Sequence, residues 1–234
     1  MPQSIHIFNK EIRAYFASPI AYIVIATFLL TVGWFFFLTF FIENQASLRH
    51  FFSLLPLMFS LVIPAATMRL VAEERNVGSY EILLTMPVTL VDVVLGKFLA
   101  ALVFVAAMLI PTLSYPITVS FLGNLDWGPV VAGYIGAIML AAAFSAAGLF
   151  ASSLTRNQII AFIIGAIICF GLATIDWVLF FLPPSILAIV QYVGAYFRFQ
   201  NIAKGIIDSR DILYFLSVSF LGLYGAYLVM WRRS

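Results

Sequence analysis

Charged side chains are scarce in this sequence: only 9% of its 234 residues are Asp, Glu, Lys or Arg, whereas 64% are hydrophobic. A soluble domain of this length cannot bury so much apolar surface in one core. Lipid must therefore be the solvent for most of the chain. The net charge of +2 is small and the basic residues are scattered singly, so nucleic acid is not an expected partner.

Cysteine and histidine are also nearly missing. The one cysteine, Cys169, lies inside an apolar run, which excludes a disulfide framework. The two histidines, His6 and His50, are predicted on opposite sides of the membrane, and no His-Glu-x-x-His motif occurs. A phosphate-binding loop is absent too, since the only Gly-Lys pair, Gly96-Lys97, lacks the rest of that motif. We therefore expect no catalytic residue, cofactor site or metal site in this chain.

Two further classes of membrane protein fit poorly. Glu73-Glu74 invites comparison with intramembrane CAAX-type proteases, but their Glu-Glu-x-x-x-Arg signature needs arginine where this chain has Gly78. A secondary transporter needs ionisable groups at mid-membrane. The deepest candidate, Asp176, is expected near the outer interface as a helix-packing carboxylate, with a place on a substrate pathway as the alternative. Lys97 is expected to extend its ammonium group to the interface.

Long apolar runs predict an all-α membrane protein with six transmembrane helices in a single domain. The predicted spans are 20–42, 51–70, 90–122, 129–154, 159–182 and 212–231. No Ala-x-Ala site follows the first span, so we interpret it as uncleaved rather than as a signal peptide. Pro111 and Pro116 predict a bend near the far end of the third span.

The fourth predicted span carries small residues four positions apart. They are Gly133, Ala137, Ala141 and Ser145. Such a stripe lets another helix approach closely. We therefore expect this span to be buried between other helices.

Two segments have a mixed polar and apolar pattern. Residues 1–19 predict an interfacial helix, with Lys10, Glu11 and Arg13 largely opposite its apolar side. In residues 183–211 an apolar stretch too short to span is followed by charged residues. We interpret the second segment as an external re-entrant or amphipathic element.

Residues 73–87 combine charged and apolar positions between the second and third predicted spans. Four ionised side chains fall within nine residues: Glu73, Glu74, Arg75 and Glu81. Apolar residues recur at helical spacing through the same stretch: Val77, Tyr80, Leu83 and Leu84. The pattern predicts a short amphipathic helix at the membrane surface. This helix should end at Met86, which precedes a proline, and Thr89 with Asp92 should cap the next span.

The distribution of Lys and Arg predicts the orientation. Eight of the 12 basic residues lie on the side of the termini and of residues 73–87, and four lie on the other side. Because cytoplasmic loops carry an excess of Lys and Arg, both termini and the 73–87 helix are predicted inside the cell. Residues 183–211 are predicted outside.

Local motifs resemble the permease subunits of ABC-2 type transporters. The stretch Glu73-Glu74-Arg75-x-x-Gly78-Ser79-x-Glu81-x-Leu83-Leu84-x-x-Pro87-Val88, followed by Gly96-Lys97, is similar to the family's segment, with serine at position 79 in place of the usual threonine. The stretch Lys10-Glu11-Ile12-Arg13-Ala14-Tyr15-Phe16-x-Ser18-Pro19-x-Ala21-Tyr22 is similar to the opening of the gliding-motility type of these permeases. Nitrous-oxide-reductase maturation permeases are more distant cousins.

This resemblance implies a function and partners. Residues 1–19 would be an elbow helix and residues 73–87 a coupling helix on a separate ABC ATPase, present in two copies, which binds ATP and Mg. A second permease copy or a larger related permease would complete the complex in the bacterial inner membrane. The residues implied at the ATPase contact are Glu73, Glu74, Arg75, Gly78, Ser79, Tyr80, Glu81 and Leu84. A membrane anchor or regulatory subunit that transports nothing is the alternative.

The external segment offers a second set of candidates. Asp176, Tyr192, Tyr196 and Arg198 could line a pathway or gate, and this segment could also bind an extracytoplasmic partner. The sequence indicates neither the substrate nor the direction of transport.

Overall fold

The computed structural model describes residues 3–43, 45–78, 88–178 and 194–232. Within these ranges every regular element is a helix, as predicted. The elements in chain order are α1 (Gln3–Ala17), α2 (Pro19–Glu43), α3 (Arg49–Thr67), α4 (Arg69–Val77), α6 (Leu90–Leu109), η1 (Ile110–Leu113), α7 (Ser114–Leu122), α8 (Trp127–Leu154), α9 (Gln158–Val178), α11 (Ala195–Ala203) and α12 (Ser209–Trp231).

Six helical segments are long and apolar enough to cross a membrane, which confirms the predicted fold class. The third of them is interrupted by the 3₁₀ turn η1, with Pro111 in its first turn. Proline lacks the N–H that an α-helix needs, so the regular α-helix is interrupted at this position.

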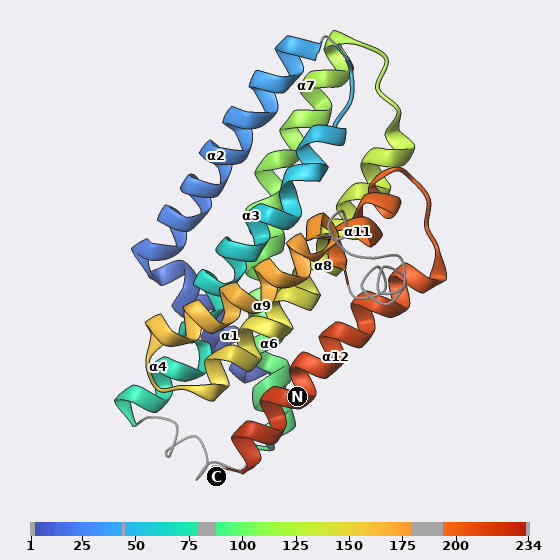
Figure 1. The fold of residues 1–234 in the computed structure, drawn as a ribbon. Coiled ribbons are helices and arrows are strands. Elements are labelled where there is room, and N and C mark those ends of the chain that lie inside the picture. Colours follow the sequence, from blue (N-terminus) through green and yellow to red (C-terminus); the bar gives the residue numbers. More distant parts are fainter. Residues whose placement is uncertain (1–2, 44, 79–87, 179–193, 233–234) are drawn as a thin grey trace.

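The two ends of the helical bundle are formed by different elements. Both chain termini, α1 and α4 lie in the lower part of Figure 1, whereas the α2–α3 connection lies at the top. We call the lower end the α4 end. The opposite end, with residues 45–48 and 123–126, we call the far end.

Helix α8 is the centre of the bundle and packs against α12, α9, α3, α11 and α6. Its glycines allow these close contacts. A Cβ atom at Gly133 would lie 2.5 Å from the ring of Phe52 on α3. One at Gly136 would lie 2.9 Å from Ile202 on α11. The small residues of the fourth span therefore serve packing within this chain.

Candidate functional site: a buried ionic cluster

Helix α1 packs on the bundle with most of its apolar side, and Glu11 lies on the packed side too. The buried residues are Ile7, Glu11 and Tyr15, which recur every four positions. Phe8, Ile12 and Phe16 are partly buried next to them. The expectation that Glu11 lies opposite the packed face is therefore wrong, because an ion pair within the bundle compensates for the burial of its charge.

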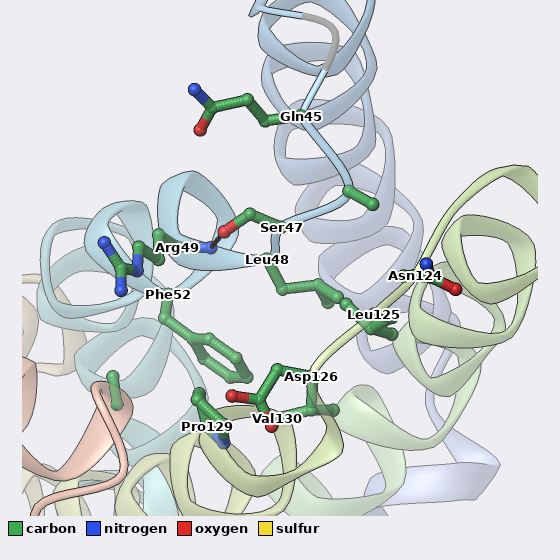
Figure 2. Close-up of a pocket in the computed structure, with 12 residues that line it drawn as sticks. Gln45, Ser47, Leu48, Arg49, Phe52, Asn124, Leu125, Asp126, Pro129 and Val130 are labelled. Carbon is green, nitrogen blue, oxygen red and sulfur yellow. Dashed lines mark hydrogen bonds between the residues drawn. The ribbon is translucent and has the colours of Figure 1, made fainter.

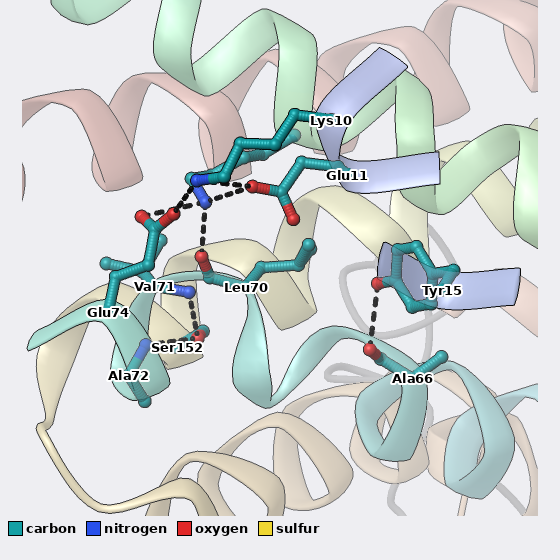
Figure 3. Close-up of polar contacts among 10 residues, drawn as sticks. Lys10, Glu11, Tyr15, Ala66, Leu70, Val71, Ala72, Glu74 and Ser152 are labelled. Carbon is teal, nitrogen blue, oxygen red and sulfur yellow. Dashed lines mark hydrogen bonds and ion pairs between the residues drawn. The ribbon is translucent and has the colours of Figure 1, made fainter. Parts of the chain in front are cut away.

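Glycine at position 96 allows α1 to lie against α6. A Cβ atom there would be 2.9 Å from the carbonyl oxygen of Ser4 and 3.0 Å from Ile7. Tyr15 completes the attachment, because its ring stacks on Phe104 of α6 at 4.8 Å and its hydroxyl donates to the Ala66 carbonyl at 2.8 Å. Figure 3 shows the Tyr15 hydroxyl directed at the Ala66 carbonyl.

Lys97 carries the most deeply buried charge at the α4 end, with a side chain only 1% exposed. Its ammonium lies 2.8 Å from Glu11 Oε1 and 2.9 Å from Glu74 Oε2 and donates to the Leu70 carbonyl at 2.6 Å. The contacts with Glu11 and the Leu70 carbonyl are hydrogen bonds, and the contact with Glu74 is an ion pair. The expectation that Lys97 reaches the interface is wrong, because acceptors from α1 and α4 hold its charge inside the bundle.

Lys10 completes the ionic cluster, by which we mean Lys10, Glu11, Glu74 and Lys97. Its ammonium group lies 2.9 Å from Glu74 Oε1 and 3.8 Å from Glu11 Oε1 (Figure 3). Partial burial lowers the pKa of Lys10, but the hydrogen bond and charge of Glu74 outweigh it, so the net shift of this pKa is upward. Two cations and two carboxylates make the cluster neutral, which allows it to be buried.

Helix α4 is attached to α8 by a second polar contact. The hydroxyl of Ser152 accepts hydrogen bonds from the backbone N–H groups of Val71 and Ala72, both at 3.1 Å, and donates to the Met68 carbonyl at 2.7 Å. The first turn of a helix leaves its N–H groups without intrahelical partners. Ser152 therefore caps α4 from another helix.

Arg75 turns inward instead of toward solvent. Its guanidinium group donates to the carbonyl of Ser153, in the last turn of α8. The free carbonyls at a helix C-terminus favour a cation. Ser152 and Arg75 together hold α4 on the end of α8.

Replacing Ser152 by alanine should lower the free energy of unfolding by about 1–3 kcal/mol, because buried polar groups of α4 lose their partner. The measurement is the unfolding midpoint of the purified chain in detergent. Ser217→Ala is the matched control, since that exposed hydroxyl bonds only within its own helix. Equal midpoints for the two variants would contradict the capping role of Ser152.

Of the residues implied at the ATPase contact, some are exposed, some point into the bundle and some lie outside the described residues. Glu73 and Gly78 are exposed, and Gly78 ends α4 with a positive φ of 80°, which favours glycine. Glu74 and Arg75 point into the bundle. Helix α4 thus covers only the first five residues of the predicted 73–87 helix, and it begins earlier, at Arg69. The remaining candidates, Ser79, Tyr80, Glu81 and Leu84, lie outside the described residues.

The candidates for a pathway or gate lie in the other half of the molecule. Asp176, in the last turn of α9, accepts a hydrogen bond from the Phe197 backbone N–H at 2.9 Å. Arg198 lies 3.1 Å from Asp211 and over the ring of Tyr214. Tyr196 is half-buried in the first turn of α11, and Tyr192 lies outside the described residues.

A polar pocket of about 320 Å³ opens at the far end (Figure 2). Its lining includes Gln45, Arg49, Asn124 and Asp126, and Phe52 contributes apolar surface. Asp126 is partly engaged, because it accepts from the Gly128 N–H as the N-cap of α8. The sequence did not indicate this pocket, because its lining comes from the connections 45–48 and 124–126 and from the ends of α3, α8 and α11.

Sequence reasoning also missed how Glu11 and Lys97 interact. Glu11 lies four residues from both Ile7 and Tyr15, so it belongs on a face with two apolar residues. Lys97 lies about two turns inside an apolar helix. A carboxylate on one apolar face and an ammonium group on another are the signal that could have indicated a buried pair.

Comparison of the sequence with protein-family models identifies the family of this chain. A family model described as ABC-2 family transporter protein matches residues 43–230. The chain belongs to the ABC-2 transporter family. It is a multi-pass membrane subunit of an ABC transporter and not itself the catalytic one, and this family implies an ABC ATPase as a partner. The match begins after α1, so it does not include Lys10 and Glu11. No curated protein matches the sequence.

Proposed function

We propose that this ABC-2 permease couples ATP hydrolysis by a separate ABC ATPase to transport or mechanical signalling across the bacterial inner membrane. Both termini and α4 would face the cytoplasm. The ATPase, which binds ATP and Mg, would contact the surface formed by Glu73, Gly78 and residues 79–87. Two ATPase copies would act on this chain and a second permease, either another copy or a larger relative.

The ionic cluster is the observation that carries this proposal. Lys97 lies on α6, Glu74 on α4 and Glu11 on α1, so a single ammonium group joins three helices. A displacement of α4 by a docked ATPase would therefore act directly on α6, which belongs to a spanning segment. Packed interiors transmit such displacements because they are not easily compressed.

Charge reversal at two glutamates of the proposed contact, Glu73 and Glu81, tests the proposal. The double variant Glu73→Lys and Glu81→Lys should reduce co-purification of the ATPase by about tenfold or more, because like charges across an interface cost several kcal/mol. Glu74 is unsuitable for this test, since its side chain is 14% exposed and belongs to the ionic cluster. The measurement is the amount of ATPase retained on the tagged permease.

Gln45→Lys is the control, because it adds a positive charge to an exposed position at the far end. It should leave co-purification unchanged. Wild-type retention of the ATPase by a correctly inserted double variant would count against the proposed contact.

The alternative, a membrane anchor that transports nothing, uses the same contact. Reconstitution of the permease with its ATPase in vesicles distinguishes the two functions. ATP-dependent flux of a cargo supports transport, whereas a nucleotide-driven change of shape without flux supports the alternative. We further propose that this chain is nearer to the gliding-motility type than to drug exporters, and the similarity of residues 10–22 to the opening of those permeases supports this.

A further inference from the structure

Helix α11 lies between spanning helices in the half of the molecule toward the far end (Figure 1). It packs against α8, α9, α3 and α12. Phe199 and Ile202 form its buried face, with 0% and 1% exposure, and both lie close to Gly136 of α8. This short helix therefore covers part of the central helix.

The N-terminus of α11 lacks a side-chain cap of its own. The N-cap residue is Gly194, with φ −68° and ψ 130°, a conformation that any residue can adopt. A Cβ atom at Gly194 would lie 1.8 Å from Oδ1 of Asp176. A side chain at position 194 would therefore displace the Asp176 carboxylate, although the backbone conformation there suits any residue.

Asp176 of α9 occupies the volume that a capping side chain would fill. Its Oδ2 accepts a hydrogen bond from the N–H of Phe197, the third residue of α11, at 2.9 Å. That N–H is one of the groups to which the side chain of an N-cap residue normally bonds. A carboxylate is also favoured at a helix N-terminus by the helix dipole.

We propose that Asp176 is the N-cap of α11, supplied by another helix. In consequence, the end of α9 stabilises the helical conformation of α11 and its packing on α8. A second attachment joins the same helix to α12, where Arg198 pairs with Asp211 at 3.1 Å. Separation of α9 from α11 therefore releases the N-terminus of α11 and uncovers the side of α8 around Gly136. The Arg198–Asp211 pair still joins α11 to α12.

Cysteine labelling of the purified full-length chain tests whether Asp176 caps α11. The reporter is Ala195→Cys, a position 1% exposed, in a chain whose native cysteine is removed by Cys169→Ala. Removing the cap with Asp176→Ala should raise the rate of maleimide labelling about fivefold, the effect expected for loss of one N-cap. Thr174→Ala is the control, since that hydroxyl bonds to the Phe170 carbonyl of its own helix, and it should leave the rate unchanged.

Moving the cap to its usual place gives the sharper test. The double variant Asp176→Ala and Gly194→Asp supplies a cap from α11 itself, and its labelling rate should return to within about twofold of the starting rate. Gly194→Ala alone should raise the rate although Asp176 is present, because the added Cβ displaces the carboxylate. Asp176→Asn keeps a capping oxygen and should raise the rate less than Asp176→Ala.

Two results would overturn the proposal. One is a labelling rate for Asp176→Ala equal to that of the parent chain. The other is a rate for the cap-swap variant as high as that of Asp176→Ala, in protein that keeps its helix content by circular dichroism. Neither measurement involves the ATPase, so failure here leaves the proposed function untouched.

Discussion

Replacing Lys97 by methionine is expected to lower the free energy of unfolding by about 3–5 kcal/mol, the cost of leaving a buried charge without its partner. The substitution removes the buried cation that contacts both Glu11 and Glu74, and it leaves these carboxylates with the more exposed Lys10. The Leu70 carbonyl also loses its donor. The expected measurement is a fall in the unfolding midpoint of the purified chain in detergent. If the proposed function holds, the ATPase would still bind, but its hydrolysis would no longer drive the permease.

Two companion variants separate the buried cluster from a surface effect. Lys10→Met removes a cation whose side chain is 60% exposed, and it should cost no more than about 1 kcal/mol. The triple variant Lys97→Met, Glu11→Gln and Glu74→Gln removes the charges together and should recover much of the lost stability. If Lys97→Met were as stable as Lys10→Met, the ionic cluster would not hold the three helices together.

Gly222→Leu is expected to destabilise the bundle by about 3 kcal/mol or more, through overpacking at a contact that cannot relax. A Cβ atom at Gly222 of α12 would lie 2.8 Å from the Ala146 carbonyl carbon and 2.9 Å from its oxygen. These are backbone atoms of α8, so no side chain can turn aside to make room. The substitution should force α12 away from α8, and the unfolding midpoint in detergent measures the loss.

Gly171→Leu is the matched control in another spanning helix. Nothing lies within 4 Å of a Cβ atom at that position, and Gly171 is exposed. Its expected effect is within about 0.5 kcal/mol, as for most surface substitutions. Equal loss of stability in the two variants would show that leucine in place of a helical glycine is harmful by itself and that the α8–α12 contact is not the cause.

The sequence was enough to predict six spanning helices, because lipid imposes a simple requirement on a spanning segment. A spanning segment must be apolar for about 20 residues and must satisfy its own backbone hydrogen bonds as a helix. Pro111 ended the regular part of the third span for an equally local reason. The small residues of α8 also predicted close packing, although not the helices that would be packed there.

The sequence predicted only part of the candidate site, because the residues of the site are far apart along the chain. Glu73 to Gly78 stood out as polar residues between spans. Ser152, however, is one of many serines in an apolar chain, and only its position beside the start of α4 makes it a cap. Asp176 likewise became a capping residue only through the position of Gly194.

The sequence by itself determined that this is a helical membrane protein with six spanning segments and one polar stretch between the second and the third. Only the tertiary structure decided that Glu11 and Lys97 are buried partners and that Arg75 turns inward. Hydropathy and periodicity report the average environment of a segment, which suffices to place helices in lipid. An ion pair depends instead on the position of two side chains 86 residues apart, which only the packed bundle specifies.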